Sequence, residues 1–187
     1  MTELPNSLSP VLLVNEQDEV LGRAEKLLAH QQGLLHRAFS VLIFNEQGDY
    51  LLQQRAAEKY HSGGLWSNTC CGHPSHPDDT LRQAQQRLKE EMGFQAELVP
   101  GFCFQYRAQL ANGLTEHEID HVFLGRYTGS VPFNHREVSA VRWLSAQALA
   151  SELASAPDTF TVWFRLLFAQ LQQSISSSFP SQDVIPD

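Results

Sequence analysis

Two segments near the start of the chain show the same order of apolar and polar positions. Apolar runs at 11–14 and 39–44 are each followed by four polar turn residues, at 15–18 and 45–48, and then by a second apolar run. Apolar runs separated by a short polar turn are typical of two antiparallel strands joined in a hairpin. The pattern therefore predicts two β-hairpins in the first part of the chain.

The segment 79–92 has the period of an amphipathic helix. Its apolar stripe consists of Leu81, Ala84, Leu88 and Met92. Thr80 and Gln83 have the spacing of an N-terminal capping box, and Gly93 follows as a C-terminal stop. We expect a helix that begins near Thr80 and ends at Gly93.

The remaining elements are strands followed by helices. Two long strands are predicted at 94–110 and 114–127, and another at 138–144. Ser145 is the candidate N-cap of a short helix, and Asp158 is that of a second helix. The second helix would run through Trp163, Leu167 and Leu171. This order indicates a mixed α/β domain of the α+β class, with a mixed, largely antiparallel β-sheet core flanked by helices.

Length and composition favour one folded domain. Of 187 residues, 42% are hydrophobic and 18% are charged, as in an ordinary globular protein. Prolines near the start and a serine run with two prolines near the end predict flexible tails at 1–10 and 174–187. The single domain is therefore expected to span 11–173.

Charge and targeting signals exclude several classes of partner. The formal net charge of −8 argues against nucleic-acid binding, which needs a basic face. The sequence has no apolar run of transmembrane length and no export pattern at its start, so we expect a cytoplasmic protein without a membrane partner. Three cysteines do not make a disulfide framework, and reduced thiols are expected.

One loop concentrates groups that can carry chemistry. Segment 66–74 contains a thiol, a flexible glycine and an imidazole in succession, at Cys71, Gly72 and His73. Such a loop is poorly suited to a core, although a turn with a buried cysteine and a surface histidine is the plainer interpretation.

Further candidate ligands lie elsewhere in the chain. His30 and His36 lie upstream, and Glu116 and Glu118 would project from one face of a strand because side chains alternate along it. Together with His73 they would suit zinc, manganese or another divalent ion better than calcium. Each histidine alone is more simply explained as a structural residue, because spacing does not show that the five converge.

The charged face of the helix at 79–92 has two interpretations. Arg87, Glu90 and Glu91 would be an ordinary solvated face on an arbitrary helix. However, Gly72 precedes the helix and Gly93 ends it, which matches the spacing of the Nudix box. In that loop–helix motif, glutamates hold a divalent metal against a diphosphate.

Taken together, these motifs resemble type I isopentenyl diphosphate isomerase, a Nudix-fold enzyme that does not hydrolyse its diphosphate. The resemblance covers about residues 10–172. Its segments are 25–26, 29–30, 35–40, 54–55, Lys59, 66–74, 87–93, 104–107, 116–118 and Trp163. The chain departs from the hydrolytic Nudix pattern at Asp78, where glutamate is usual, and at Gln86-Arg87, which replaces an Arg-Glu pair. A mixed Nudix-type sheet flanked by helices is therefore expected.

The resemblance implies a role for each matching residue. It implies that one divalent metal, manganese, zinc or magnesium, is held by His30, His36, His73, Glu116 and Glu118. It implies that proton transfer and substrate contact involve Cys71, Glu118, Tyr106 beside Glu118, and Trp163 over the hydrocarbon end. Glu91 would help to hold a magnesium ion that arrives with the diphosphate, and the phosphates would contact Lys26, Arg55, Lys59 and Arg87. No flavin is implied.

The implied reaction explains why such residues are needed. Moving the double bond of isopentenyl diphosphate to give dimethylallyl diphosphate adds one proton and removes another, and an alkene is a very weak base. The carbocation-like species requires a site that excludes water and stabilises positive charge. A cation over an indole face gains about 2 kcal/mol when desolvated, which suits Trp163, with Trp66 as a second candidate. Which of Cys71 and Glu118 protonates the alkene stays open.

Two other functions are compatible with some of these residues. A Nudix hydrolase would use Glu90 and Glu91 but has Arg87 in place of its usual glutamate, and a non-enzymatic metal-stabilised domain would not need Cys71. We expect a monomer that acts on a small diphosphate. Cys70 and Cys103 are interpreted as small buried residues. The non-ligand histidines, at the surface or on strands, would be His61, His76, His117, His121 and His135.

Overall fold

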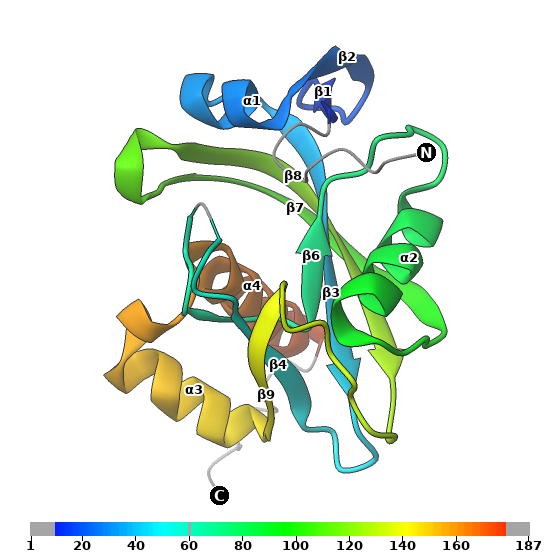
Figure 1. Cartoon of the computed structure of the whole chain (residues 1–187), viewed down its shortest axis with the longest axis vertical. Coiled ribbons are helices and arrows are strands. Elements are labelled where there is room, and N and C mark those ends of the chain that lie inside the picture. The colour runs from blue at the N-terminus through cyan, green and yellow to red at the C-terminus, as the bar shows by residue number, and fades with distance from the viewer. Residues whose placement is uncertain (1–9, 60, 179–187) are drawn as a thin grey trace, which may run out of the picture.

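The computed structural model describes residues 10–59 and 61–178, which form one mixed sheet with helices against it (Figure 1). The strands are β1 (Pro10–Val14), β2 (Val20–Glu25), β3 (His36–Phe44), β4 (Tyr50–Arg55), β5 (Trp66–Ser67), β6 (Cys70–Gly72), β7 (Leu98–Gln109), β8 (Thr115–Arg126) and β9 (Val138–Leu144). The helices are α1 (Lys26–Gln32), α2 (Thr80–Met92), α3 (Ala146–Ser155) and α4 (Val162–Ser178), with 3₁₀ turns at Ala111–Gly113 and Pro157–Thr159.

Strand β3 is the centre of the sheet. It pairs in parallel with β8 and antiparallel with β1, β4 and β6, while β7 pairs with β8 and β9 with β4. The parallel register places His36 opposite Glu118, and the β7–β8 hairpin places Tyr106 opposite Glu118. The sheet is therefore mixed, as predicted, and its register brings three candidate site residues to neighbouring positions.

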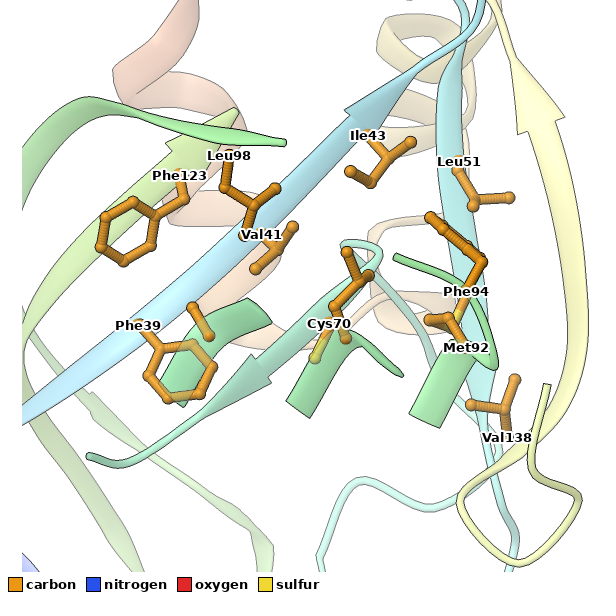
Figure 2. Packing of buried hydrophobic residues seen from close by; sticks show 12 residues of the cluster. Phe39, Val41, Ile43, Leu51, Cys70, Met92, Phe94, Leu98, Phe123 and Val138 are labelled. Carbon is orange, nitrogen blue, oxygen red and sulfur yellow. The ribbon is translucent and has the colours of Figure 1, made fainter. Parts of the chain in front are cut away.

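The two faces of β3 pack into two different cores, because successive side chains point to opposite sides. Phe39, Val41 and Ile43 face the cluster formed with α2, which Figure 2 shows. Leu42 belongs to the second cluster, formed with α3 and α4 on the other side of the sheet. The central strand is consequently buried along almost its whole length.

The predicted hairpins, the helix at α2 and the strand at β9 are confirmed. Gly93 ends α2 in the left-handed conformation, with φ of 76°, and its Cα packs so closely on Pro132 that a side chain would not fit. The capping box is wrong: Asp79 is the N-cap residue and its side chain makes no capping bond. Gln83 instead accepts from Ser75 N at 2.7 Å, because the preceding loop folds back onto the helix.

Several boundaries differ from the predicted ones. Ser145 caps α3 as expected, by accepting from Ala148 N. Asp158 does not cap α4; it lies in the turn at Pro157–Thr159, and the helix begins at Val162. Strand β7 begins at Leu98 rather than at residue 94, because residues 94–97 link α2 to the sheet edge.

The predicted tails overlap two elements. Pro10 belongs to β1, and residues 174–178 belong to α4, so both elements extend past the predicted domain limits. The remaining tail residues, 1–9 and 179–187, lie outside the described residues. Within the described parts of the chain, no helix has the length and apolarity to cross a membrane.

The two cysteines that were predicted to be buried, Cys70 and Cys103, differ in exposure. Cys70 is fully buried in the α2 core, as predicted. Cys103 is exposed, so its assignment as a buried residue is wrong. The reason is the alternation of β7, in which Phe102, Phe104 and Tyr106 point inward and the residues between them point out.

Candidate active site

Five predicted ligands converge in the fold. They come from α1 (His30), β3 (His36), the residue after β6 (His73) and β8 (Glu116 and Glu118). Their ligand atoms all lie within 4.8 Å of one another. The pairing of β3 with β8 supplies two of these positions, and α1 packs on β8 to supply a third. We call this group the His/Glu cluster.

Hydrogen bonds at the back of the cluster orient two imidazoles. His30 Nδ1 donates to Lys26 O at 2.6 Å, and His36 Nδ1 donates to Leu34 O at 2.8 Å, since a carbonyl can only accept. In the neutral rings, Nε2 therefore carries a lone pair and faces the cluster. A backbone carbonyl behind a metal-binding histidine is the usual way to fix this tautomer.

The front of the cluster fits a divalent cation. His30 Nε2 lies 2.9 Å from Glu116 Oε2, and when the imidazole is neutral both atoms present lone pairs to the space between them. Nε2 of His30, Nε2 of His36 and Oε2 of Glu116 are buried and have no hydrogen-bond partner among the described residues. A cation would satisfy all three atoms at once. Three imidazoles and two carboxylates are ligands that divalent transition ions accept readily.

One cavity of about 870 Å³ connects the cluster with the other predicted residues. Every predicted site residue lines this cavity except His30, His36 and Trp66, and the Trp66 ring packs under the Arg142 guanidinium instead. The predicted residues that line it are Lys26, Arg55, Lys59, Cys71, His73, Arg87, Glu91, Tyr106, Glu116, Glu118 and Trp163. Residues spread over most of the chain therefore line one cavity.

Cys71 and Glu118 hold opposite protonation states in this cavity. Burial raises the pKa of the Cys71 thiol to about 12, so the thiol is protonated at neutral pH. Burial works against ionisation of Glu118 as well, but contacts with His36 and other neighbours outweigh it and hold the pKa of Glu118 at about 2. Tyr106 Oη donates to Glu118 Oε2 at 2.6 Å. One protonated and one ionised group therefore face the same space.

At one end of the cavity, which we call the cationic end, basic side chains form ion pairs with carboxylates. Arg87 pairs with Glu91 and with Glu137, both at 2.7 Å, and Lys59 also pairs with Glu137. Gln53 Nε2 donates to the other oxygen of Glu91 at 2.8 Å. Glu137 was not among the predicted residues, because it lies in a loop before β9 with no pattern around it.

Two further cations complete this end. Arg55 and Lys26 also line the cavity. The guanidinium carbon of Arg55 lies 5.1 Å from the centre of the Trp163 ring. Burial lowers the pKa of the Lys26 ammonium group. Trp163 itself is 4% exposed. Basic side chains and the buried Trp163 ring are therefore adjacent in this cavity.

His61 is a buried residue, so its interpretation as a surface or strand histidine is wrong. It lies in the loop after β4, is 7% exposed, and lines the cavity. Its Nε2 lies 3.8 Å from Glu116 Oε1. Burial lowers its pKa to about 3. Its loop has no periodic pattern, and only the folding of the loop against α4 brings it to the site.

Asp120 is a second buried group that the sequence did not reveal. Ser40 Oγ donates to Asp120 Oδ2 at 2.8 Å, and Oδ1 has no hydrogen-bond partner among the described residues. Burial, reinforced by the charge of Glu118, raises the pKa of Asp120 to about 8. The folded protein therefore keeps a proton here that the unfolded chain loses from about pH 4, so stability falls as pH rises between about pH 4 and about pH 8.

We expect Asp120→Asn to remove this pH-dependent loss, since the amide oxygen can still accept from Ser40. The free energy of unfolding of the variant, relative to that of the unchanged protein, should increase from about pH 5 to about pH 8. Urea denaturation at both pH values measures it, with exposed Asp78→Asn as the control. Parallel pH curves for Asp120→Asn and the unchanged protein would contradict the prediction.

Comparison with known proteins agrees with this geometry. A family model described as the NUDIX domain matches residues 34–164. A protein from Pectobacterium atrosepticum named isopentenyl-diphosphate Delta-isomerase is 50% identical over 165 residues, which cover 88% of this chain and 92% of the relative. The chain belongs to the Nudix family of isopentenyl-diphosphate Delta-isomerases. A Burkholderia multivorans protein of the same name is 50% identical over 158 residues, which cover 84% of this chain and 89% of the relative.

Solved structures independently show the fold expected of a Nudix isomerase. A Deinococcus radiodurans protein aligns with a TM-score of 0.63 at 19% identity, covering 79% of this chain and 90% of that chain. A MutT protein from Methanosarcina mazei aligns with a TM-score of 0.59 at 24% identity, covering 75% and 95%. These likenesses confirm the Nudix-type fold, and at such identities they concern the fold alone.

Proposed function

We propose that this isomerase-family chain interconverts isopentenyl diphosphate and dimethylallyl diphosphate, as a monomer acting on this small molecule. The observation that carries the proposal is that Cys71 and Glu118 line one cavity in opposite protonation states, next to Trp163 and a cationic end. An allylic double-bond shift needs one group that gives a proton and one that takes a proton. The cavity supplies both.

The cavity also suits the intermediate of such a reaction. Proton addition to the alkene builds positive charge on a tertiary carbon, which water would trap. Trp163 and Tyr106 are buried aromatic residues in the cavity wall, and neither side chain carries a charge that would repel a cation. An indole face stabilises a desolvated cation by about 2 kcal/mol, which would lower the free energy of the carbocation-like species.

Two groups on different strands perform the proton transfers. Cys71 on β6 carries its proton, while Glu118 on β8 is ionised and accepts from the Tyr106 hydroxyl. This hydrogen bond fixes the orientation of the carboxylate and offers it a proton. Because the reaction is reversible, each group must be able to give a proton in one direction and accept it in the other.

The His/Glu cluster would hold one divalent ion, manganese, zinc or magnesium. Its ligands would be His30, His36, His73, Glu116 and Glu118. The buried, unpartnered atoms of His30, His36 and Glu116 support this assignment. When bound, the ion would draw electron density from the Glu118 carboxyl group and so adjust its acidity. No flavin is needed, because no electron is transferred.

The cationic end would bind the diphosphate together with a magnesium ion. Lys26, Arg55, Lys59 and Arg87 would contact the phosphate oxygens, and Glu91 would help to hold the magnesium ion. Glu137 pairs with both Lys59 and Arg87 in the structure, so the diphosphate would compete with it for these cations. This local positive charge is required because the whole chain has a formal charge of −8.

The function is tested by incubating the purified protein with isopentenyl diphosphate and magnesium in heavy water. We expect dimethylallyl diphosphate that carries deuterium, with no phosphate release, because a solvent-derived proton enters the product. Proton magnetic resonance of the product and a colorimetric phosphate assay measure the two outcomes. Phosphate release without an allylic product would instead indicate hydrolysis, and unlabelled, unchanged substrate would overturn the proposal.

A further inference from the structure

His61 occupies a position between the His/Glu cluster and the aromatic wall. Its Nε2 lies 3.8 Å from Glu116 Oε1, and its ring centre lies 6.1 Å from that of His30. On another side its ring meets the Trp163 indole nearly at a right angle, with the ring centres 5.7 Å apart. One imidazole therefore contacts both the candidate metal ligands and the candidate cation-stabilising residue.

The Glu116 carboxylate lies between two imidazoles, one of which is that of His61. Its two carboxylate oxygens face two different imidazoles: Oε2 lies 2.9 Å from His30, and Oε1 faces His61. A ligating carboxylate is usually held by a hydrogen bond to its other oxygen, and such partners orient the ligand. At 3.8 Å, His61 Nε2 lies just outside hydrogen-bond range, so a small movement of either side chain closes the contact.

The loop that carries His61 is fixed to β4. Arg55 Nη2 donates to the backbone oxygen of His61 at 3.4 Å, and Arg55 N donates to Leu65 O at 2.9 Å. Gly64 N donates back to Arg55 O at 3.0 Å. These bonds hold the loop independently of the His61 side chain. A substitution at His61 should therefore leave the backbone of the loop in place.

We propose that His61 is a positioning residue that orients the Glu116 carboxylate for metal binding and supports the ring of Trp163. It reaches the reaction only through these two residues. The part that concerns Trp163 rests on the proposed isomerisation, whereas the part that concerns Glu116 needs only a metal at the His/Glu cluster. The two parts can be separated, because a hydrogen-bond donor serves Glu116 and an aromatic ring serves Trp163.

Three substitutions separate these contributions. His61→Gln keeps an N–H donor near the position of Nε2 but removes the ring, His61→Phe keeps a ring but removes the donor, and His61→Ala removes both. We expect Mn²⁺ affinity of the metal-stripped full chain to fall about 10–100-fold in His61→Ala and His61→Phe. His61→Gln should recover most of that affinity. Isothermal titration with Mn²⁺ alone measures this without any substrate.

Steady-state kinetics with isopentenyl diphosphate test the second part. At saturating Mn²⁺, kcat should be higher in His61→Phe than in His61→Ala, because the ring still supports Trp163. KM should change little in any variant, since the phosphate-binding side chains are unaltered. Exposed His135→Gln is the matched control and should change neither affinity nor kcat.

Two results would overturn the inference. Unchanged Mn²⁺ affinity in His61→Ala would remove the role toward Glu116, and equal losses in Gln, Phe and Ala variants would indicate a merely structural residue. Circular dichroism of each stripped variant shows whether it is folded before titration. If the unchanged protein binds Mn²⁺ but does not isomerise the substrate, the proposed function fails while the affinity series still decides the role of His61 toward Glu116.

Discussion

Cys71→Ala is expected to lower kcat for isopentenyl diphosphate by about 10²–10⁴-fold, the usual contribution of one proton-transfer group. The thiol lines the cavity and burial keeps it protonated, so its removal deletes one of the two groups between which the alkene would exchange protons. No neighbouring thiol can replace it, because Cys70 points into the α2 core. Initial rates of dimethylallyl diphosphate formation measure the effect.

The fold should tolerate this substitution. Cys71 is only partly buried, and its strand pairs with Ser40 of β3 through the backbone, which alanine preserves. The thermal unfolding midpoint should therefore stay close to that of the unchanged protein. Cys103→Ala removes an exposed thiol on β7 and should retain full activity. Near-normal turnover in Cys71→Ala would exclude the thiol from the chemistry.

Glu118→Gln is expected to cause a loss of turnover at least as large, about 10³-fold or more, because one carboxylate has two proposed tasks. The amide can neither accept a proton at neutral pH nor bind a cation as strongly as a carboxylate. The side chain is isosteric, and its oxygen can still accept from the Tyr106 hydroxyl. Turnover and Mn²⁺ affinity should therefore fall together while the protein stays folded.

The control for this variant is Glu46→Gln, at an exposed turn between β3 and β4. It changes the net charge equally and should alter neither measurement. A Glu118→Gln protein that lost Mn²⁺ affinity but kept its turnover would assign Glu118 to the metal site alone. Retention of both would remove Glu118 from the proposed mechanism.

Local patterns in the sequence were sufficient where chemistry within a few residues decides the structure. The hairpins, α2 with its stop at Gly93, and the Ser145 cap are all confirmed, because turn residues, helical period and caps act over short distances. The capping box at Thr80 and the cap at Asp158 are wrong for a related reason. In both places, longer-range packing placed another residue at the start of the helix.

The candidate site was predictable only as a set of residue types. Alternation along a strand correctly predicts that Glu116 and Glu118 share a face, and the same rule applied to β7 would have placed Cys103 outside. Resemblance to a family supplied the assignment of the remaining residues. Spacing alone could not join His30, on a short helix, to His73, which follows β6.

The sequence by itself determined the period of each strand and helix, the family, and the residue types available for proton transfer, metal binding and phosphate binding. Only the tertiary structure decided that β3 and β8 pair in parallel, which sets His36 opposite Glu118, and that His61 and Glu137 join the cavity. The physical reason is that strand register and loop docking depend on burial across the whole domain. Such contacts link residues that are far apart along the chain, so no local pattern records them.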